Sequence, residues 1–126
     1  MKIVSSEAMT RIDRRSQEEF AIPSTALMED AGVKAWAVLR RRVWHGRPDG
    51  RIVFAAGRGN NGGDAFVMAR QAATEGFPSL SIILAAGRPE PGSDPGRNLA
   101  SCEALGIEIL EWSSRADVAI KVLKSI

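Results

Sequence analysis

The fold is decided by residues 52–64, which read Ile52-Val53-Phe54-Ala55-Ala56-Gly57-Arg58-Gly59-Asn60-Asn61-Gly62-Gly63-Asp64. The first five residues form a short, continuous apolar run, which predicts a strand buried on both faces of a parallel sheet. The glycines that follow predict a turn, and small residues spaced along 64–75 predict a helix that lies close to the sheet. The stretch therefore predicts a strand, a glycine-rich turn and a helix, which together begin a right-handed βαβ crossover.

The rest of the chain extends this pattern in both directions. Before the strand, apolar residues at helical spacing predict one helix over residues 6–20, capped by Ser5 or Ser6, and a second from Ser24, as its cap, to near Trp44. After it, the sequence predicts strands at 80–85 and 107–110, a loop at 87–96, and helices around 99–105 and at 116–123. The predicted fold is α/β, a Rossmann-like three-layer sandwich whose parallel sheet follows two N-terminal helices.

Composition limits the classes of function. The 126 residues are 44% hydrophobic, which suits one globular domain, and 17 basic against 15 acidic residues give a net charge of only +2. That balance predicts no nucleic-acid partner. The single cysteine, Cys102, excludes a disulfide framework and favours a reducing compartment. Because no apolar stretch is long enough to span a membrane or form a signal peptide, we expect a cytoplasmic protein.

The glycine-rich turn is the main candidate site. A helix that follows a parallel strand directs unpaired N–H groups and its positive dipole end at the crevice where ligands bind. Glycines there would permit positive φ angles and remove Cβ atoms that block a ligand. Gly57, Gly59 and Gly62 satisfy the G-x-G-x-x-G pattern of dinucleotide-binding turns. However, residues 85–88 lack the acidic residue of NAD dehydrogenases, and no Gly-Lys-Ser/Thr follows, which excludes a Walker A loop.

Two amides and a carboxylate distinguish this turn from a simple phosphate-binding loop. Asn60-Asn61-Gly62-Gly63-Asp64 resembles the signature of the YjeF N-terminal domain family, the NAD(P)HX epimerases. Two further parts of the chain resemble the same family, Met9-Thr10-Arg11-Ile12-Asp13 and the segment from Ile22 to Gly32. The resemblance extends over positions 1 to about 110. It implies that residues 1–126 are the N-terminal part of a single epimerase domain, and that the chain is truncated relative to it.

The resemblance also implies an activity and a set of site residues. Family members interconvert the R and S forms of hydrated NADH and NADPH, called NADHX and NADPHX. By resemblance, Asn60, Asn61, Gly62, Gly63 and Asp64 bind this substrate, and Asn61 is also a ligand of a potassium ion. Asp64 either holds a ribose hydroxyl or acts catalytically in proton transfer at the hydrated ring. Amide and carbonyl oxygens suit a hard cation such as potassium.

The same resemblance implies partners. An NAD(P)HX dehydratase, which in bacteria is often fused to the epimerase, would use the product, and we expect a homodimer. We also expect weak binding and little epimerase activity from 126 residues alone, since a parallel α/β site uses several strand ends. Two residues depart from the common family pattern: Asp30 stands for Asn, which adds charge near a polyanionic ligand, and Ala65 stands for Gly.

Other interpretations remain open at this stage. Asn60 and Asn61 could serve only to form a left-handed turn, and Asp64 only to cap a helix. The fold could belong to a non-catalytic scaffold of RNA processing or protein assembly, or to a conventional dinucleotide-binding dehydrogenase domain. Arg58 could meet a phosphate or be solvated. Cys102, beside Leu99 and Leu105 on one helix face, is predicted to be a buried core thiol, and His45 to stabilise a helix C-terminus.

Overall fold

Three parallel strands form the centre of the fold, which is described here by a computed structural model for residues 3–44, 50–112 and 124. The strands are β1 (Arg51–Ala56), β2 (Ser79–Leu84) and β3 (Glu108–Glu111), and they lie in the order β1-β2-β3. The helix α3 (Asn60–Thr74) connects β1 to β2, and α4 (Asp94–Ala104) connects β2 to β3. The predicted α/β fold with a parallel sheet is confirmed.

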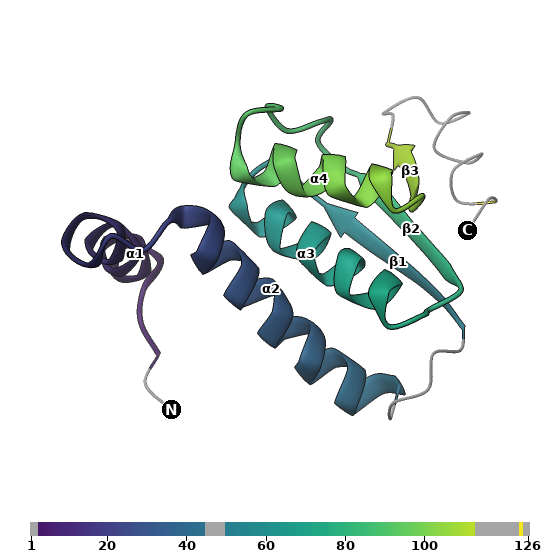
Figure 1. Cartoon of the computed structure of the whole chain (residues 1–126), viewed down its shortest axis with the longest axis horizontal. Helices are drawn as coiled ribbons and strands as arrows, with labels where there is room; N and C mark the ends of the chain where they lie inside the picture. Colours follow the sequence, from purple (N-terminus) through teal and green to yellow (C-terminus); the bar gives the residue numbers. More distant parts are fainter. Residues whose placement is uncertain (1–2, 45–49, 113–123, 125–126) are drawn as a thin grey trace.

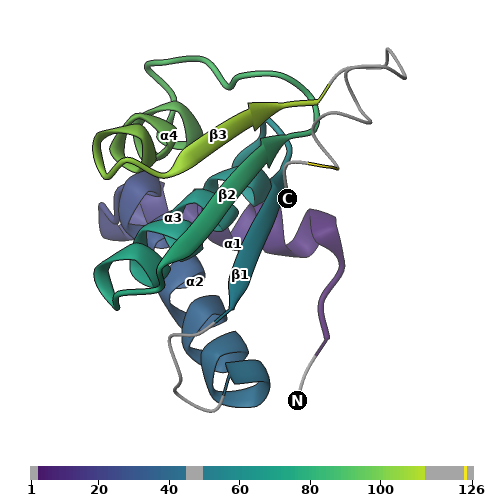
Figure 2. The ribbon, with the colours of Figure 1, turned by 90° about the vertical axis from the view of Figure 1, so that its right-hand side faces the viewer.

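The described helices that pack on the sheet all cover the same face of it. Figure 2 shows α3 and α4 on one side of the strands, with α2 (Ser24–Leu39) beside α3. The core between these layers includes Phe54, Ile82 and Leu84 from the sheet, with Trp36 and Phe66 from the helices. Within the described residues the molecule thus has two of the three predicted layers, one of helices and one of strands.

The first strand departs from the prediction that both of its faces are buried. Ile52, Phe54 and Ala56 are buried under the helices, but the intervening residues of β1 are exposed, and Val53 has 37% of its surface accessible. The continuous apolar run therefore reflects one covered face, while the other face is left open by the described residues. A partly apolar open face of this kind is a place where further chain or another molecule can pack.

The first helix is attached only loosely. α1 (Ser6–Phe20) is capped by Ser5, whose side chain accepts a hydrogen bond from the Ala8 N–H, and it ends at Ala21 in a left-handed conformation with φ of 53°. None of its residues is buried, and it stands away from the sheet beyond the N-terminal end of α2 (Figure 1). Its sequence is amphipathic, so the helix was predictable, but its position depends on contacts with α2.

Several helix boundaries differ from the predictions, each for an identifiable reason. α3 begins at Asn60 rather than Asp64, because the first turn of a helix tolerates poor helix formers whose N–H groups need no partner within the helix. α4 begins at Asp94, inside the predicted loop, with Ser93 as its cap and Pro95 in its first turn, a position that proline favours.

The second helix differs at both ends. Pro23, not Ser24, is the capping residue of α2, and no side chain caps this end. After Leu39 the chain continues as a π-helical turn, η1 (Arg40–Trp44), rather than as regular α-helix. His45 and the helix predicted at 116–123 lie outside the described residues.

Cys102 is a core residue, as predicted. Its thiol is fully buried and donates a hydrogen bond to the Phe66 carbonyl at 3.3 Å, and burial raises its pKa to about 12. Such a thiol is not a nucleophile at neutral pH. Across the ranges that the structure covers, no helix combines the length and the apolar character that crossing a membrane requires.

Candidate functional site

A cavity of about 690 Å³ lies where the first turns of α2, α3 and α4 meet, and α1 closes one side of it. Ser24, Asn60 and Asp94, the first residues of these three helices, all line it. The first N–H groups of a helix have no partner within the helix, and together they carry a partial positive charge. The starts of α2 and α3 therefore offer backbone donors beside the cavity, whereas in α4 Pro95 has no N–H and the Gly96 N–H is bonded to the Ser93 side chain.

Two residues of the predicted motif reach this cavity. Asn60 and Asp64 lie one helical turn apart on α3 and both line the cavity, while Asn61 is exposed beside it. Within the described part of the chain, none of these three side chains has a hydrogen-bond partner in the protein. Their polar groups are therefore available to a ligand.

The purely structural explanation of these residues is wrong. Gly59 is the capping residue of α3, and Asp64 is the fifth residue of the helix, so Asp64 does not cap it. Asn60 and Asn61 are helical, and neither has a positive φ. Turn formation and capping thus leave the two amides and the carboxylate unexplained.

The glycines of the turn fall into two groups. A Cβ at Gly62 would lie 1.8 Å from the Gly57 carbonyl oxygen, and one at Gly63 would lie 2.4 Å from the Met28 sulfur. At Gly57 and Gly59, a Cβ would meet nothing within 4 Å. None of the four has the positive φ that we expected.

The substrate-binding role predicted for Gly62 and Gly63 stays a prediction. Both glycines are buried, and neither lines the cavity. Close packing of α3 against the strand end and against Met28 already accounts for the need for glycine at both positions.

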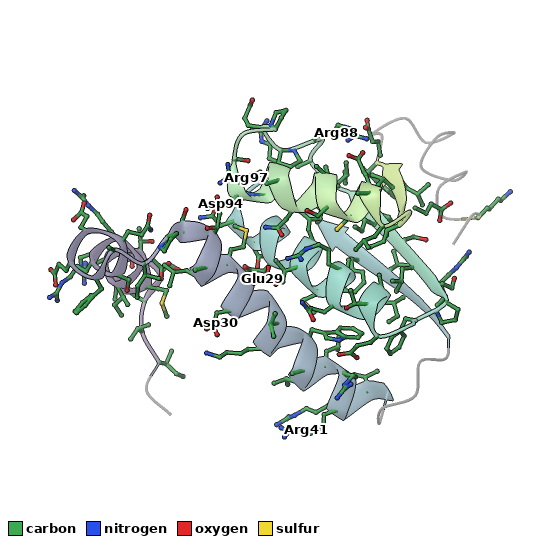
Figure 3. All side chains as sticks on the ribbon, in the orientation of Figure 1. Glu29, Asp30, Arg41, Arg88, Asp94 and Arg97 are labelled. Carbon is green, nitrogen blue, oxygen red and sulfur yellow. The ribbon has the colours of Figure 1, made fainter. Side chains whose placement is uncertain are left out.

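The charge around the cavity is one-sided. Asp13 from α1, Asp64 from α3 and Asp94 from α4 line it, and no Lys or Arg side chain among the described residues does so. Asp94 forms an ion pair with Arg97 on the rim, and Figure 3 shows the two side chains together at the start of α4. Burial and the neighbouring carboxylate of Asp13 both raise the pKa of Asp64, and burial is the larger cause.

Several lining residues were not predicted as site residues. Asp13 and Gln17 reach the cavity from α1 because they follow Met9 at four-residue intervals, which places all three on one helix face. This spacing is visible in the sequence, but the sequence does not show which element that face meets. Ser93 and Asp94 were not predicted as site residues because the prolines and glycines of residues 87–96 predict a loop there.

Two other predicted features lie away from the cavity. Asp30 is exposed on α2, forms an ion pair with Lys34 at 2.6 Å, and does not line the cavity. That it adds charge near a bound ligand stays a prediction. Arg58 is also exposed and lies outside the cavity lining.

Potassium binding at Asn61 is untested by the geometry. Over the residues described, no group of three or more His, Cys, Asp or Glu side chains could hold a metal ion. Amide and carbonyl oxygens, by contrast, are typical donors to hard cations. The unpartnered amide of Asn61 fits one such ligand.

Comparisons with known proteins identify the family of this chain. The profile of the family described as YjeF-related protein N-terminus matches residues 24–123. A bifunctional NAD(P)H-hydrate repair enzyme of Moorella thermoacetica is 38% identical over 69 residues, which cover 55% of this chain and 13% of that protein. An NAD(P)H-hydrate epimerase of Rhodopirellula baltica is 33% identical over 66 residues, which cover 52% of this chain and 25% of that protein.

A solved structure shows the same fold. The crystal structure of the yeast protein ynu0, YNL200c, aligns with a TM-score of 0.76 and 24% identity, and it covers 92% of this chain and 49% of the yeast chain. The chain therefore spans about half of the yeast chain and a quarter or less of the two curated relatives described above. The profile match covers most of the chain and includes β1, the glycine-rich turn and both crossover helices. The chain belongs to the family of YjeF-related protein N-terminal domains.

Proposed function

We propose that this protein is an NAD(P)HX epimerase, which interconverts the R and S forms of hydrated NADH and NADPH. The observation that carries the proposal is the cavity at the helix N-termini, where Asn60 and Asp64 of the family motif lie side by side without protein partners. Relatives named as NAD(P)H-hydrate epimerase and as repair enzymes support the same activity.

Each polar side chain has a role that its chemistry allows. The Asn60 amide can both donate to and accept from ribose or carboxamide groups of the dinucleotide. Asp64, with its raised pKa, keeps a proton to higher pH than an ordinary aspartate, so it suits proton transfer at the hydroxyl of the hydrated carbon. In the proposed site Asp64 is the catalytic residue, and Asn60, Asn61, Gly62 and Gly63 form the substrate-binding turn.

A potassium ion and a partner enzyme belong to the same proposal. Asn61 would give one amide oxygen to potassium, which would supply positive charge near the diphosphate of the substrate. Because relatives carry the name of bifunctional repair enzymes, we propose that an NAD(P)HX dehydratase, separate or fused, uses the product. We propose a homodimer as the working form, and the open face of β1 and the exposed side of α1 are surfaces available for such contacts.

The first test is binding to the 126-residue chain. Addition of NADPH, and then of an R/S mixture of NADPHX, to the ¹⁵N-labelled protein should shift amide signals of residues 57–64 and of the start of α4. Shifts confined to the opposite ends of the helices would contradict the proposed site.

The second test is turnover. In a chain extended to the full family domain, the rate at which R-NADPHX converts to S-NADPHX should rise above the spontaneous rate when potassium is present, and Asp64→Asn should remove the increase. Residues 1–126 alone should show little of this increase. Binding without any turnover, together with equal behaviour of Asp64→Asn and the parent, would favour a non-catalytic binding module of the same fold.

A further inference from the structure

The first helix lies outside the range matched by the family profile, yet it forms one wall of the cavity. The matched range begins at residue 24, whereas α1 ends at Phe20. Met9, Asp13 and Gln17 lie on one face of α1 and line the cavity with Asn60 and Asp64 of α3. No residue of α1 is buried, so the side chains of this face remain accessible from the cavity.

We propose that Asp13 is a positioning residue for Asp64, and that it acts by holding a second carboxylate in the same cavity, which favours the protonated form of Asp64. This inference rests on the proposed epimerase function, in which Asp64 moves a proton at the substrate. It adds a role for α1 that the glycine-rich turn alone does not contain.

The charges that face Asp64 support this pairing. Asp13 on α1 and Asp94 at the start of α4 are the other charged side chains that line the cavity within the described residues, and the wall formed by α2 has none. Asp94 is balanced by Arg97, whereas Asp13 forms no ion pair among the described side chains. Asp13 is therefore the lining carboxylate, other than Asp64 itself, whose negative charge is not balanced by an ion pair among the described side chains.

Two carboxylates in one partly enclosed site disfavour the doubly charged state, which favours protonation of one of them. Asp64 is half-buried and Asp13 is exposed, so burial selects Asp64 as the group that retains it. The direction of the Asp64 pKa agrees, because burial raises it first and Asp13 raises it further. The protonated form of Asp64 can donate a hydrogen bond to a substrate hydroxyl, which the carboxylate form cannot do.

The test measures Asp64 itself in the 126-residue chain without any ligand. The Asp64 carboxyl carbon is followed by ¹³C NMR during a pH titration of the parent, Asp13→Asn, Asp13→Glu and Asp30→Asn. Asp13→Asn should increase the acid dissociation constant of Asp64 about fivefold, which corresponds to the loss of one nearby charge in a solvent-like medium. Asp13→Glu should restore the parent value.

Asp30→Asn is the matched control. It replaces the same carboxylate by the same amide on the neighbouring helix, but Asp30 does not line the cavity. It should leave the Asp64 titration unchanged. An unchanged titration in Asp13→Asn, with the amide spectrum of the folded protein retained, would overturn the inference.

A binding assay with NADPHX separates this inference from the proposed function. If the Asp64 titration responds to Asp13 but a chain extended to the full family domain neither binds nor converts NADPHX, the epimerase proposal fails while the coupling of Asp13 to Asp64 stands. If the chain converts NADPHX and the titration does not respond, the epimerase proposal stands and the role of Asp13 is overturned.

Discussion

The two halves of the glycine-rich turn use the same residue type for different purposes. Gly57 and Gly59 face open space, whereas Gly62 and Gly63 are packed against a backbone carbonyl and a methionine. The second half brings α3 close to the strand end, and that approach places Asn60 and Asp64 at the cavity. The comparison teaches that part of a ligand-binding motif is structural, and that its structural part positions the chemical part.

The largest effect should come from filling the packed half. Gly62→Ala places a Cβ 1.8 Å from the Gly57 carbonyl oxygen, which cannot move without distortion of the end of β1. We expect a loss of about 3 kcal/mol or more in the free energy of unfolding, measured by urea denaturation. Gly57→Ala is the control, since it meets no atom and should change stability by less than about 0.5 kcal/mol. Equal losses in the two variants would remove the distinction between the halves.

Asp64→Asn should separate chemistry from stability. The change keeps the shape of a side chain that neither caps the helix nor has a hydrogen-bond partner, so the fold should persist. The conversion of R- to S-NADPHX should slow by about 100-fold, the effect of a lost acid–base group. Retention of the parent rate would assign Asp64 to binding alone.

The same variant should show a pH-dependent gain in stability. The folded state raises the pKa of Asp64 above its ordinary 3.8, so the folded protein binds this proton more tightly than the unfolded chain does. The free energy of unfolding of the parent therefore falls, relative to that of Asp64→Asn, as the pH rises above 3.8. Below that pH Asp64 is protonated in both the folded and the unfolded state, so it causes no pH dependence there. Unfolding curves of both proteins at pH 3 and pH 7 measure the difference. If the parent instead gained stability relative to Asp64→Asn between pH 3 and pH 7, the direction of the pKa change would be contradicted.

Gly63→Ala should have a smaller effect than Gly62→Ala. The group that its Cβ would meet is the sulfur and terminal methyl of Met28, which belong to a flexible side chain. We expect a loss of about 1 kcal/mol. A second variant that shortens the partner, Met28→Ala in the Gly63→Ala background, should show strong non-additivity with the single variants. Simple addition of the two losses would place the two residues out of contact.

Much of this fold was predictable because local pattern and global fold agree. The parallel strands, the crossover helices and the buried Cys102 follow from apolar runs and helical spacing. The helix boundaries at Asn60 and Asp94 were not predictable in this way, because glycine, asparagine and proline resemble loop residues while the first turn of a helix accepts them.

The site was only half predictable for a different reason. Asn60 and Asp64 belong to a contiguous motif, so the sequence shows them directly. Asp13 lies 47 positions before Asn60 in the sequence and reaches the same cavity from α1, which packs on α2. Long-range placement of this kind leaves no local signature.

The smallest effect is expected at Asp30, which sharpens the comparison by marking where the site ends. Asp30 lies on the side of α2 away from α3, while Glu29 on the other side pairs with Arg70 of α3 (Figure 3). The ion pair between Asp30 and Lys34 is exposed and joins residues one helical turn apart. Asp30→Asn should therefore lower the free energy of unfolding by less than about 0.5 kcal/mol. NADPH affinity, measured by calorimetry, should not change, because the charge that is removed lies outside the cavity. If Asp30→Asn instead strengthened NADPH binding, with the effect lost at high salt, Asp30 would face the bound diphosphate and the site would extend past α2.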